Sequence, residues 1–464
     1  MEHTERMGRE PVIKLMLSFA LPAMTGILAH ALYNIVDRLF VGHWVGPSAI
    51  AGIIVAFPFM IAISAVGNFI GVGSATLISL ALGNGRRGRA ERFLGFAFLM
   101  LIVAGSLLTL GGWFFLDPLL WASGASPTIL PYAREYTGVI VWGSFFSLTA
   151  FTCNSLIRAE GAPYFAMMTL VLGALTNVVL DALFIIVWGM GIQGAALATV
   201  ISQMISAAWA VSFYFRKQST LRLRKKRLRP RWSLLRRVAS MGIPPFLMEV
   251  SFTVLMGVFN HMARRYGGDM ALASMGIFFS IDTLLFLPVL GVGEGIQPLV
   301  GYNYGAGYYR RTVITAHLGT ALCTAFFTMS TLAVQFFPEI MVMAFTRGDD
   351  GLLAMTVRAM RLGYMGLPCV GIYMVAVFFL QGLGKATTGM VLSLSRQIFI
   401  ILPLLVFLPR FWGLDGVWVA FAISDVVGGA MAALFYGAEC RRLRRMGEGA
   451  ENGEIPSTPQ AFIG

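Results

Sequence analysis

Two stretches of this sequence decide the fold: residues 71–85 read GVGSATLISLALGNG, and residues 293–307 read GEGIQPLVGYNYGAG. They lie 222 positions apart (293 − 71 = 222), and glycine stands at the same four places in each. The same offset pairs residues on both sides, namely Pro22 with Pro244, Gly46 with Gly268, Arg89 with Arg311, Gly191 with Gly413, Gly194 with Gly416 and Ser202 with Ser424. One constant offset over so long a distance indicates an internal duplication.

The composition places the duplicated chain in a membrane. Hydrophobic residues make up 57% of the 464 residues and charged residues only 12%, with a mean hydropathy of +0.76, whereas about a quarter of the residues in soluble domains are charged. The 52 glycines fit the same interpretation, because small residues let membrane-spanning helices approach each other closely. Soluble and fibrous proteins are therefore excluded.

Long apolar runs follow one another along the chain. A helix that crosses a bilayer needs about 20 mostly apolar residues, and twelve such runs are recognisable: 12–40, 49–82, 91–116, 132–158, 164–188, 193–215, 238–262, 271–303, 311–337, 353–382, 387–409 and 414–439. Each half of the duplication holds six, so both copies enter the membrane in the same orientation. We predict an all-α polytopic membrane protein with two pseudo-symmetric six-helix bundles, related as a parallel repeat.

Basic residues are concentrated beside the apolar runs. The net charge is +13, and Lys and Arg cluster between Arg216 and Arg237 and again between Arg441 and Arg445. Such clusters mark cytoplasmic segments and attract anionic lipid headgroups, so we expect both termini in the cytoplasm, membrane lipids as partners and no nucleic acid. The predicted domains are an N-terminal lobe (1–215), a basic cytoplasmic linker (216–237), a C-terminal lobe (238–440) and a cytoplasmic tail (441–464).

Motifs for catalysis or metal binding are missing from the sequence. No P-loop, HExxH or nucleophile elbow occurs. Neither a disulfide framework nor a zinc site is indicated, because no CxxC spacing connects the four cysteines, Cys153, Cys323, Cys369 and Cys440. We predict a protein that is not an enzyme, needs no cofactor and is not driven by ATP hydrolysis.

Four polar residues of the N-terminal half lie at similar depths in the predicted spans. Asp181 follows Asn177 by four residues on span five, so both lie on one helix face. Asp37 on span one and Thr199 on span six reach a comparable depth. Two carboxylates, an amide and a hydroxyl can bind a hard cation such as Na+ through oxygen, or share a proton. The alternative is four polar residues that are hydrogen-bonded separately and serve packing alone.

These polar residues do not recur in the second half. Whereas the scaffold glycines are repeated, the offset of 222 carries Asp37 to Phe259, Asp181 to Pro403 and Thr199 to Phe421. Residues needed for packing in both halves should recur more often than residues that serve a single site. The difference therefore favours one site in the N-terminal half.

A second set of charged residues lies near the middle of spans in the C-terminal half: Glu249, Asp282 and Arg396. Ionisable groups are costly there and are functional candidates by default. Arg396 stays protonated and needs an acceptor, for which Glu249 and Asp282 have the right depth. The set either lines a cavity that meets substrate or proton, or locks the lobe as a buried ion pair. Glu294 and Asp425 lie close to glycines, where we expect a structural role.

Several short segments have a recognisable order and spacing: Leu21-Pro22 through Asp37 and Gly42, Gly83-Asn84-Gly85, Leu156 to Gly161, Asn177 to Asp181, and Gln297 to Ala306. Together they resemble the multidrug and toxic compound extrusion (MATE) family. The resemblance covers nearly the whole chain, from Pro11 to about Arg445. It is closest to the branch that includes the DNA-damage-inducible protein F transporters.

This resemblance implies two six-helix bundles in the V-shaped MATE fold, which export cationic, often aromatic compounds against the entry of Na+ or H+. Carried over residue by residue, it implies a cation site made of Asp37, Asn177, Asp181 and Thr199, with Asn154 as a further member. Other branches of the family place essential acids in spans seven and ten. Here span seven has Glu249, but span ten has no acid between Gly351 and Lys385.

We therefore expect a secondary antiporter in the cytoplasmic membrane of a prokaryote, acting as a monomer, that exports small organic cations in exchange for Na+ or H+. A flippase for a lipid-linked oligosaccharide is the first alternative. Such flippases resemble this fold but tend to carry cationic cavities for pyrophosphate, whereas the N-terminal half here offers carboxylates. A membrane enzyme or receptor is the alternative from another class, and neither a catalytic motif nor a soluble domain favours it.

Overall fold

The computed structural model describes residues 2–224, 227–228, 230–346 and 349–451, and these contain helices and turns but no strand. Internal contacts divide the chain into a first unit, Met1–Glu10 with Leu21–Phe246, and a second unit, Pro11–Ala20 with Leu247–Gly464. The chain thus changes unit three times, between α1 (Glu2–Arg9) and α2 (Val12–Phe40), inside α2 and inside α9 (Trp232–Gly305). The predicted boundaries were at 215 and 238. Residues 452–464 of the predicted tail, and 225–226 and 229 of the predicted linker, lie outside the described residues.

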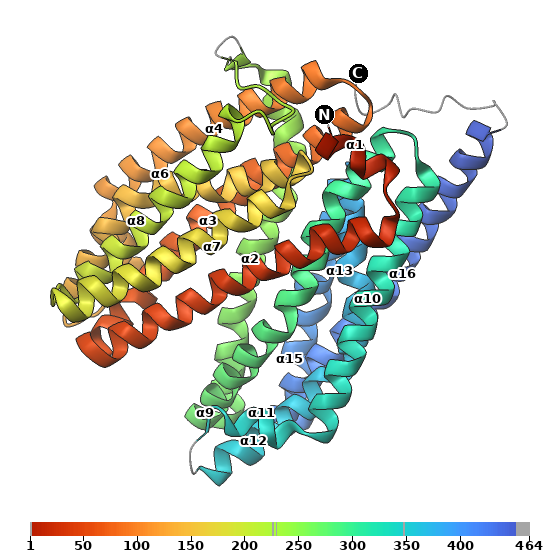
Figure 1. The fold of residues 1–464 in the computed structure, drawn as a ribbon. Coiled ribbons are helices and arrows are strands. Elements are labelled where there is room, and N and C mark those ends of the chain that lie inside the picture. The colour runs from red at the N-terminus through yellow and green to blue at the C-terminus, as the bar shows by residue number, and fades with distance from the viewer. Residues whose placement is uncertain (1, 225–226, 229, 347–348, 452–464) are drawn as a thin grey trace. The chain divides into compact units, whose positions relative to one another are not determined.

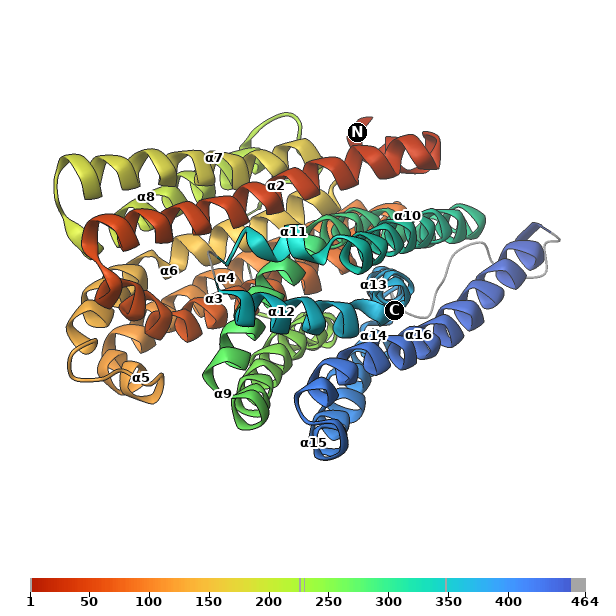
Figure 2. The ribbon, with the colours of Figure 1, turned by 90° about the horizontal axis from the view of Figure 1, so that it is seen from below.

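The first unit is a bundle of helices (Figure 1). They are α1 (Glu2–Arg9), α2 (Val12–Phe40, from Leu21 on), α3 (Pro47–Gly83), α4 (Arg87–Phe114), α5 (Leu116–Ala122), α6 (Leu130–Ala159), α7 (Pro163–Asp181) and α8 (Gly191–Ser212). Helix α6 packs against α3, α4, α7 and α8, and these helices run side by side in Figures 1 and 2. Small residues allow this packing, since a Cβ at Gly71 would lie 3.2 Å from the backbone of Thr152.

The second unit is a second bundle. Its helices are α9 (Trp232–Gly305, from Leu247 on), α10 (Tyr309–Phe336), α11 (Pro338–Met343), α12 (Asp350–Gly363), α13 (Leu367–Gly382), α14 (Ala386–Leu394), α15 (Ile401–Trp412) and α16 (Leu414–Glu451). Helix α13 packs against both α10 and α16. At Gly371 the two neighbouring backbones leave no room for a side chain, because an added Cβ would lie 2.6 Å from the backbone nitrogen of Thr324.

The number of membrane spans agrees with the sequence. Among the described residues, eleven helices are long and apolar enough to cross a bilayer. One of them, α9, has 74 residues and is broken at Gly268, whose φ is 68° and ψ −158°, so it holds two spans. The prediction of twelve spans is confirmed. The boundaries are also close, as for span four, predicted at 132–158 and found at Leu130–Ala159.

The duplication is visible in the backbone. Glycines paired by the offset of 222 share the left-handed region that other residues avoid. The φ values are 118° and 68° for Gly46 and Gly268, 65° and 77° for Gly85 and Gly307, and 60° and 56° for Gly191 and Gly413. These pairs lie in the connections between spans, so both halves turn the chain with the same device.

Candidate functional site

The structure brings the polar residues predicted in the N-terminal half together inside the first unit. Asp37 comes from α2, Asn177 and Asp181 from α7, and Thr199 from α8; all are buried. The Asn177 amide Nδ2 donates to the Thr199 hydroxyl at 3.4 Å. Asp37 and Asp181 lie within reach of a hydrogen bond between their carboxyl groups. Three helices therefore supply one buried polar cluster, which we call the N-unit cluster.

Most oxygen atoms of the N-unit cluster lack a donor. Both carboxylate oxygens of Asp181, Oδ1 of Asp37 and Oδ1 of Asn177 are buried without a hydrogen-bond partner. Within the described part of the chain, neither carboxylate forms an ion pair. Carboxylates only accept hydrogen bonds, so two of them can be joined only by a proton or a cation. The arrangement is suited to binding one of these.

Residues that the sequence analysis missed surround the N-unit cluster. Tyr136 of α6 is 1% exposed and lies near Thr199, Asp37 and Asp181. Tyr33 lies one turn before Asp37 on α2 and lines a small pocket together with Gln203 of α8. The spacing of four residues between Tyr33 and Asp37 could have indicated from the sequence that Tyr33 lies beside the cluster. An aromatic residue such as Tyr136 in an apolar span looks like ordinary packing.

Helical irregularities accompany both carboxylates. The π-helical segment η1 (Val41–Val45) begins four residues after Asp37, and η2 (Ala182–Val187) follows Asp181 directly. π-Helical turns are rare and often mark functional sites. The widened turns change the direction in which the neighbouring side chains point. They therefore help to orient the Asp37 and Asp181 carboxylates.

Asn154, the fifth predicted member, has another role in the structure. Its Nδ2 donates to the backbone oxygen of Ala166 at 2.6 Å, which ties α6 to the first turn of α7. Asn177 lies eleven residues further along α7, about 16 Å at the rise of an α-helix. The structure therefore does not bring Asn154 to the N-unit cluster.

The charged residues of the C-terminal half are paired differently from the prediction. Arg396 does form an ion pair, but its partner is Asp425 of α16, with Nε and Oδ1 3.1 Å apart, and neither Glu249 nor Asp282 takes this place. Asp282 lies close to both members of the pair. The expectation failed because several carboxylates share one depth, and depth does not show which helix faces Arg396.

Packing around Arg396 explains the partner. Its guanidinium lies 4.8 Å from the centre of the Tyr373 ring. Gly428, one turn after Asp425, leaves room for the arginine stem, since a Cβ there would lie 2.9 Å from Arg396 Cδ. A third π-helical segment, η6 (Ser395–Ile400), contains Arg396. We call Arg396, Asp425 and Asp282 the C-unit cluster; unlike the N-unit cluster, it contains its own positive charge.

The place in the second unit that corresponds to the N-unit cluster is aromatic. Phe259 and Phe421 stand at the positions of Asp37 and Thr199 in the repeat. Their rings are stacked, with centroids 4.0 Å apart and planes 10° apart. These two positions are therefore in contact as an aromatic pair in the second unit, whereas in the first unit both belong to the N-unit cluster.

A further buried carboxylate, Glu160, lies outside the spans, between α6 and α7. Its Oε2 accepts hydrogen bonds from Ser219 Oγ at 3.0 Å, from the backbone nitrogen and hydroxyl of Thr220 at 3.1 Å each, and from the backbone nitrogen of Leu221 at 3.3 Å. Burial raises the pKa of Glu160 to about 7, although these donors act in the opposite direction. Glu160 holds the segment after α8 against α6.

Comparisons with known proteins agree with the fold and with its duplication. The family model described as MatE matches residues 22–183 and again residues 244–406, two matches that begin 222 positions apart. The chain is similar to the "Multidrug export protein MepA" of Staphylococcus aureus (strain MRSA252), with 27% identity over 418 residues, 90% of this chain and 92% of the relative.

Two solved structures have the same fold. One shows the outward-facing conformation of a multidrug resistance MATE family transporter of the MOP superfamily, with a TM-score of 0.88, 23% identity, and coverage of 95% of this chain and 98% of that one. The other is a MOP superfamily transporter from Pyrococcus furiosus, with a TM-score of 0.89, 22% identity and the same coverage.

Proposed function

Because the chain belongs to the MatE family of membrane transporters, we propose that it is a secondary antiporter that exports organic cations in exchange for Na+ or H+ at Asp37 and Asp181. The observation that carries the proposal is the N-unit cluster, in which three buried carboxylate oxygens have no donor and neither carboxylate forms an ion pair with a described residue. The name of the staphylococcal relative, a multidrug export protein, supports drugs as the substrate class.

The chemistry of the cluster fits either coupling ion. Na+ takes oxygen ligands, as hard cations do, and Asp37, Asp181, the Asn177 amide and the Thr199 hydroxyl supply them. A proton would instead bridge the two carboxyl groups, which lie within hydrogen-bonding reach. In both cases the entering ion neutralises negative charge that is otherwise buried in the membrane.

Exchange follows from competition for this charge. A cationic substrate and the coupling ion both stabilise the ionised carboxylates, and each shifts the protein toward the conformation that binds it better. If the two cannot be bound together with full affinity, release of one favours binding of the other, and the coupling is reciprocal. Tyr33 and Tyr136 beside the carboxylates offer aromatic faces to an organic cation.

The orientation that we propose places both termini in the cytoplasm. The basic segments at 216–237 and 441–445 would then lie on the side with the anionic leaflet. Transport by a monomer and location in the cytoplasmic membrane of a prokaryote complete the proposal. The C-unit cluster has a structural role in it, because Arg396 and Asp425 neutralise each other.

A reconstituted system tests the proposal. The full chain in proteoliposomes should expel ethidium, a fluorescent organic cation, when either an inward Na+ gradient or an inward proton gradient is imposed alone. The gradient that drives efflux identifies the coupling ion. A matched control is Asp117→Asn, which changes an exposed carboxylate paired with Arg134 at 3.2 Å. If neither gradient drives efflux and the vesicles instead flip a lipid-linked oligosaccharide, the antiporter proposal is wrong.

A further inference from the structure

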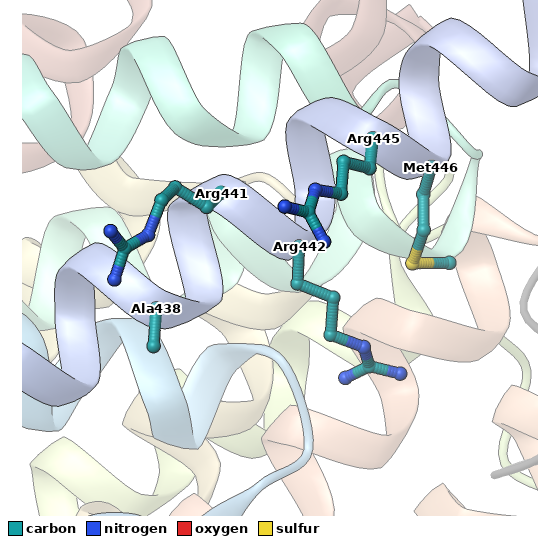
Figure 3. Close-up of a pocket in the computed structure, with 5 residues that line it drawn as sticks. All are labelled: Ala438, Arg441, Arg442, Arg445 and Met446. Carbon is teal, nitrogen blue, oxygen red and sulfur yellow. The ribbon is translucent and has the colours of Figure 1, made fainter.

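The last helix of the second unit carries a basic pocket that the transport proposal does not use. It has a volume of about 460 Å3 and is lined by Ala438, Arg441, Arg442, Arg445 and Met446. Residue 438, the pair 441–442 and the pair 445–446 recur every three or four positions on α16 and so form one stripe along the helix. Figure 3 shows the three guanidinium groups projecting from this stretch, with Ala438 and Met446 beside them.

The length of α16 places the pocket at the membrane surface. The helix has 38 residues, about 57 Å at 1.5 Å per residue, whereas the hydrocarbon layer is about 30 Å thick. Asp415 in its first turn is paired with Arg358 and marks one surface. About 20 residues then cross the hydrocarbon layer, so residues 438–446 fall in the layer of lipid headgroups on the other side.

The charge in the pocket is not neutralised from within. Arg442 is paired with Glu439 at 3.1 Å, but Glu439 is also paired with Lys385 at 2.5 Å. Arg441 and Arg445 form no ion pair with any residue that the structure describes, although Glu448 is only three residues beyond Arg445. Two exposed guanidinium groups one turn apart are therefore available to a ligand.

The other basic cluster of the chain differs in this respect. Arg224 and Arg227, in the segment between α8 and α9, lie 3.7 Å and 3.1 Å from the buried carboxylate of Glu91. Arg227 also donates to the backbone oxygen of Gly88. That segment uses part of its charge to bind the first unit, whereas Arg441 and Arg445 on α16 form no ion pair with the described residues.

From this geometry we propose that the pocket on α16 binds the headgroup of an anionic phospholipid, with Arg441 and Arg445 holding the phosphodiester. Guanidinium groups form paired hydrogen bonds to phosphate oxygens. Ala438 and Met446 contact the glycerol and the upper acyl chain, which a free phosphate lacks. A zwitterionic headgroup is disfavoured because its ammonium group meets three arginines.

The test uses the full chain in detergent, titrated with phosphatidylglycerol, with phosphatidylcholine of the same acyl chains, or with inorganic phosphate, and bound lipid is counted by native mass spectrometry. The test variant is Arg441→Gln with Arg445→Gln. The matched control is Arg310→Gln with Arg444→Gln, which removes the same charge outside the pocket; Arg444 contacts His317 at 3.2 Å. Thermal melting of each variant verifies that it is folded.

We expect phosphatidylglycerol to bind the wild type in preference to phosphatidylcholine. The test variant should lose about tenfold or more in affinity, since each basic residue near a membrane surface contributes substantially to anionic lipid binding. The control should lose clearly less, because neither Arg310 nor Arg444 lines the pocket. Equal binding by the test variant, an equal loss in the control, no preference for phosphatidylglycerol, or displacement of lipid by inorganic phosphate would each overturn the proposal. Ethidium efflux is a separate readout, so failure here leaves the antiporter proposal untouched.

Discussion

The two units handle buried charge in opposite ways. In the first unit, Asp37 and Asp181 lie close together and form no ion pair with any residue that the structure describes; both oxygens of Asp181 and Oδ1 of Asp37 lack a donor. In the second unit, Asp425 is held by Arg396, and Asp282 lies beside the pair. Each cluster contains two aspartates, but only the second includes a positive charge that pairs with one of them.

This difference teaches what makes a buried acid available for transport. A charge in the membrane needs a partner. Asp425 has a basic partner within the fold, so its charge is already neutralised. Asp181 has no ion-pair partner among the described residues, so its positive partner must enter from solution. Phe259 and Phe421, which occupy the corresponding place in the second unit, show that the scaffold itself does not require polar groups there.

The largest effect should come from removing the charge of the N-unit cluster. Asp37→Asn and Asp181→Asn each place a neutral amide with its own donor where an acceptor stood, so gradient-driven ethidium efflux should fall by about tenfold or more as the coupling of ion to substrate is lost. Thermal melting should show a folded protein. The control is Phe259→Leu, the corresponding change in the second unit. If either aspartate variant transports normally while Phe259→Leu abolishes transport, the assignment of coupling to the first unit is wrong.

Breaking the ion pair of the C-unit cluster should instead cost stability. Arg396→Ala leaves Asp425 buried and unpaired, which typically destabilises by about 3–5 kcal/mol, and unfolding in detergent measures it. Adding Asp425→Asn to Arg396→Ala should recover part of the loss. A double-mutant cycle in which Glu249→Gln couples to Arg396→Ala more strongly than Asp425→Asn does would show that the assigned pairing is wrong.

Glu160 shows what hydrogen-bond donors do for a buried acid without a counter-charge, since it has donors but no ion-pair partner among the residues that the structure describes. Its pKa of about 7 lies above its ordinary value of 4.5, so the folded protein holds a proton that the unfolded chain releases between these values. The contribution of Glu160 to the free energy of unfolding should therefore be fully present below pH 4.5. It should decrease as the pH rises toward 7 and not change further above pH 7.

The fall is at most about 3 kcal/mol, because one pKa unit corresponds to about 1.4 kcal/mol. Glu160→Gln keeps an acceptor for Ser219 and Thr220 without a titratable group, so the variant should lack this part of the pH dependence. Unfolding of both proteins at pH 5 and pH 8 gives the difference. An identical pH profile for the two proteins contradicts the assignment to Glu160.

The smallest effect is expected from Thr199→Val. The change removes one neutral hydroxyl, which accepts from Asn177 at 3.4 Å, and such a group contributes about 1 kcal/mol. The concentration of the coupling ion needed for half-maximal efflux should rise by about fivefold with little change in maximal rate. Phe421→Leu is the matched change in the second unit and should leave this concentration unaltered; an equal rise there would show that both positions act through packing alone.

The sequence by itself determined the spans, the duplication and part of the candidate site. Hydropathy is a local property, so twelve spans could be read along the chain, and the recurring glycines carried the repeat. A spacing of four residues placed Asn177 and Asp181 on one helix face. A comparable depth in the spans grouped Asp37 and Thr199 with them, and the family resemblance implied the same set.

The tertiary structure alone decided which groups meet. Arg396 could have paired with any carboxylate at its depth, and the rotation and neighbours of α14 to α16 selected Asp425. The rotation and packing of the helices likewise place Tyr136 beside the N-unit cluster and direct Asn154 toward the backbone of Ala166. Hydropathy fixes how far along the membrane normal a residue lies but not the direction in which it points, and contacts between helices depend on that direction.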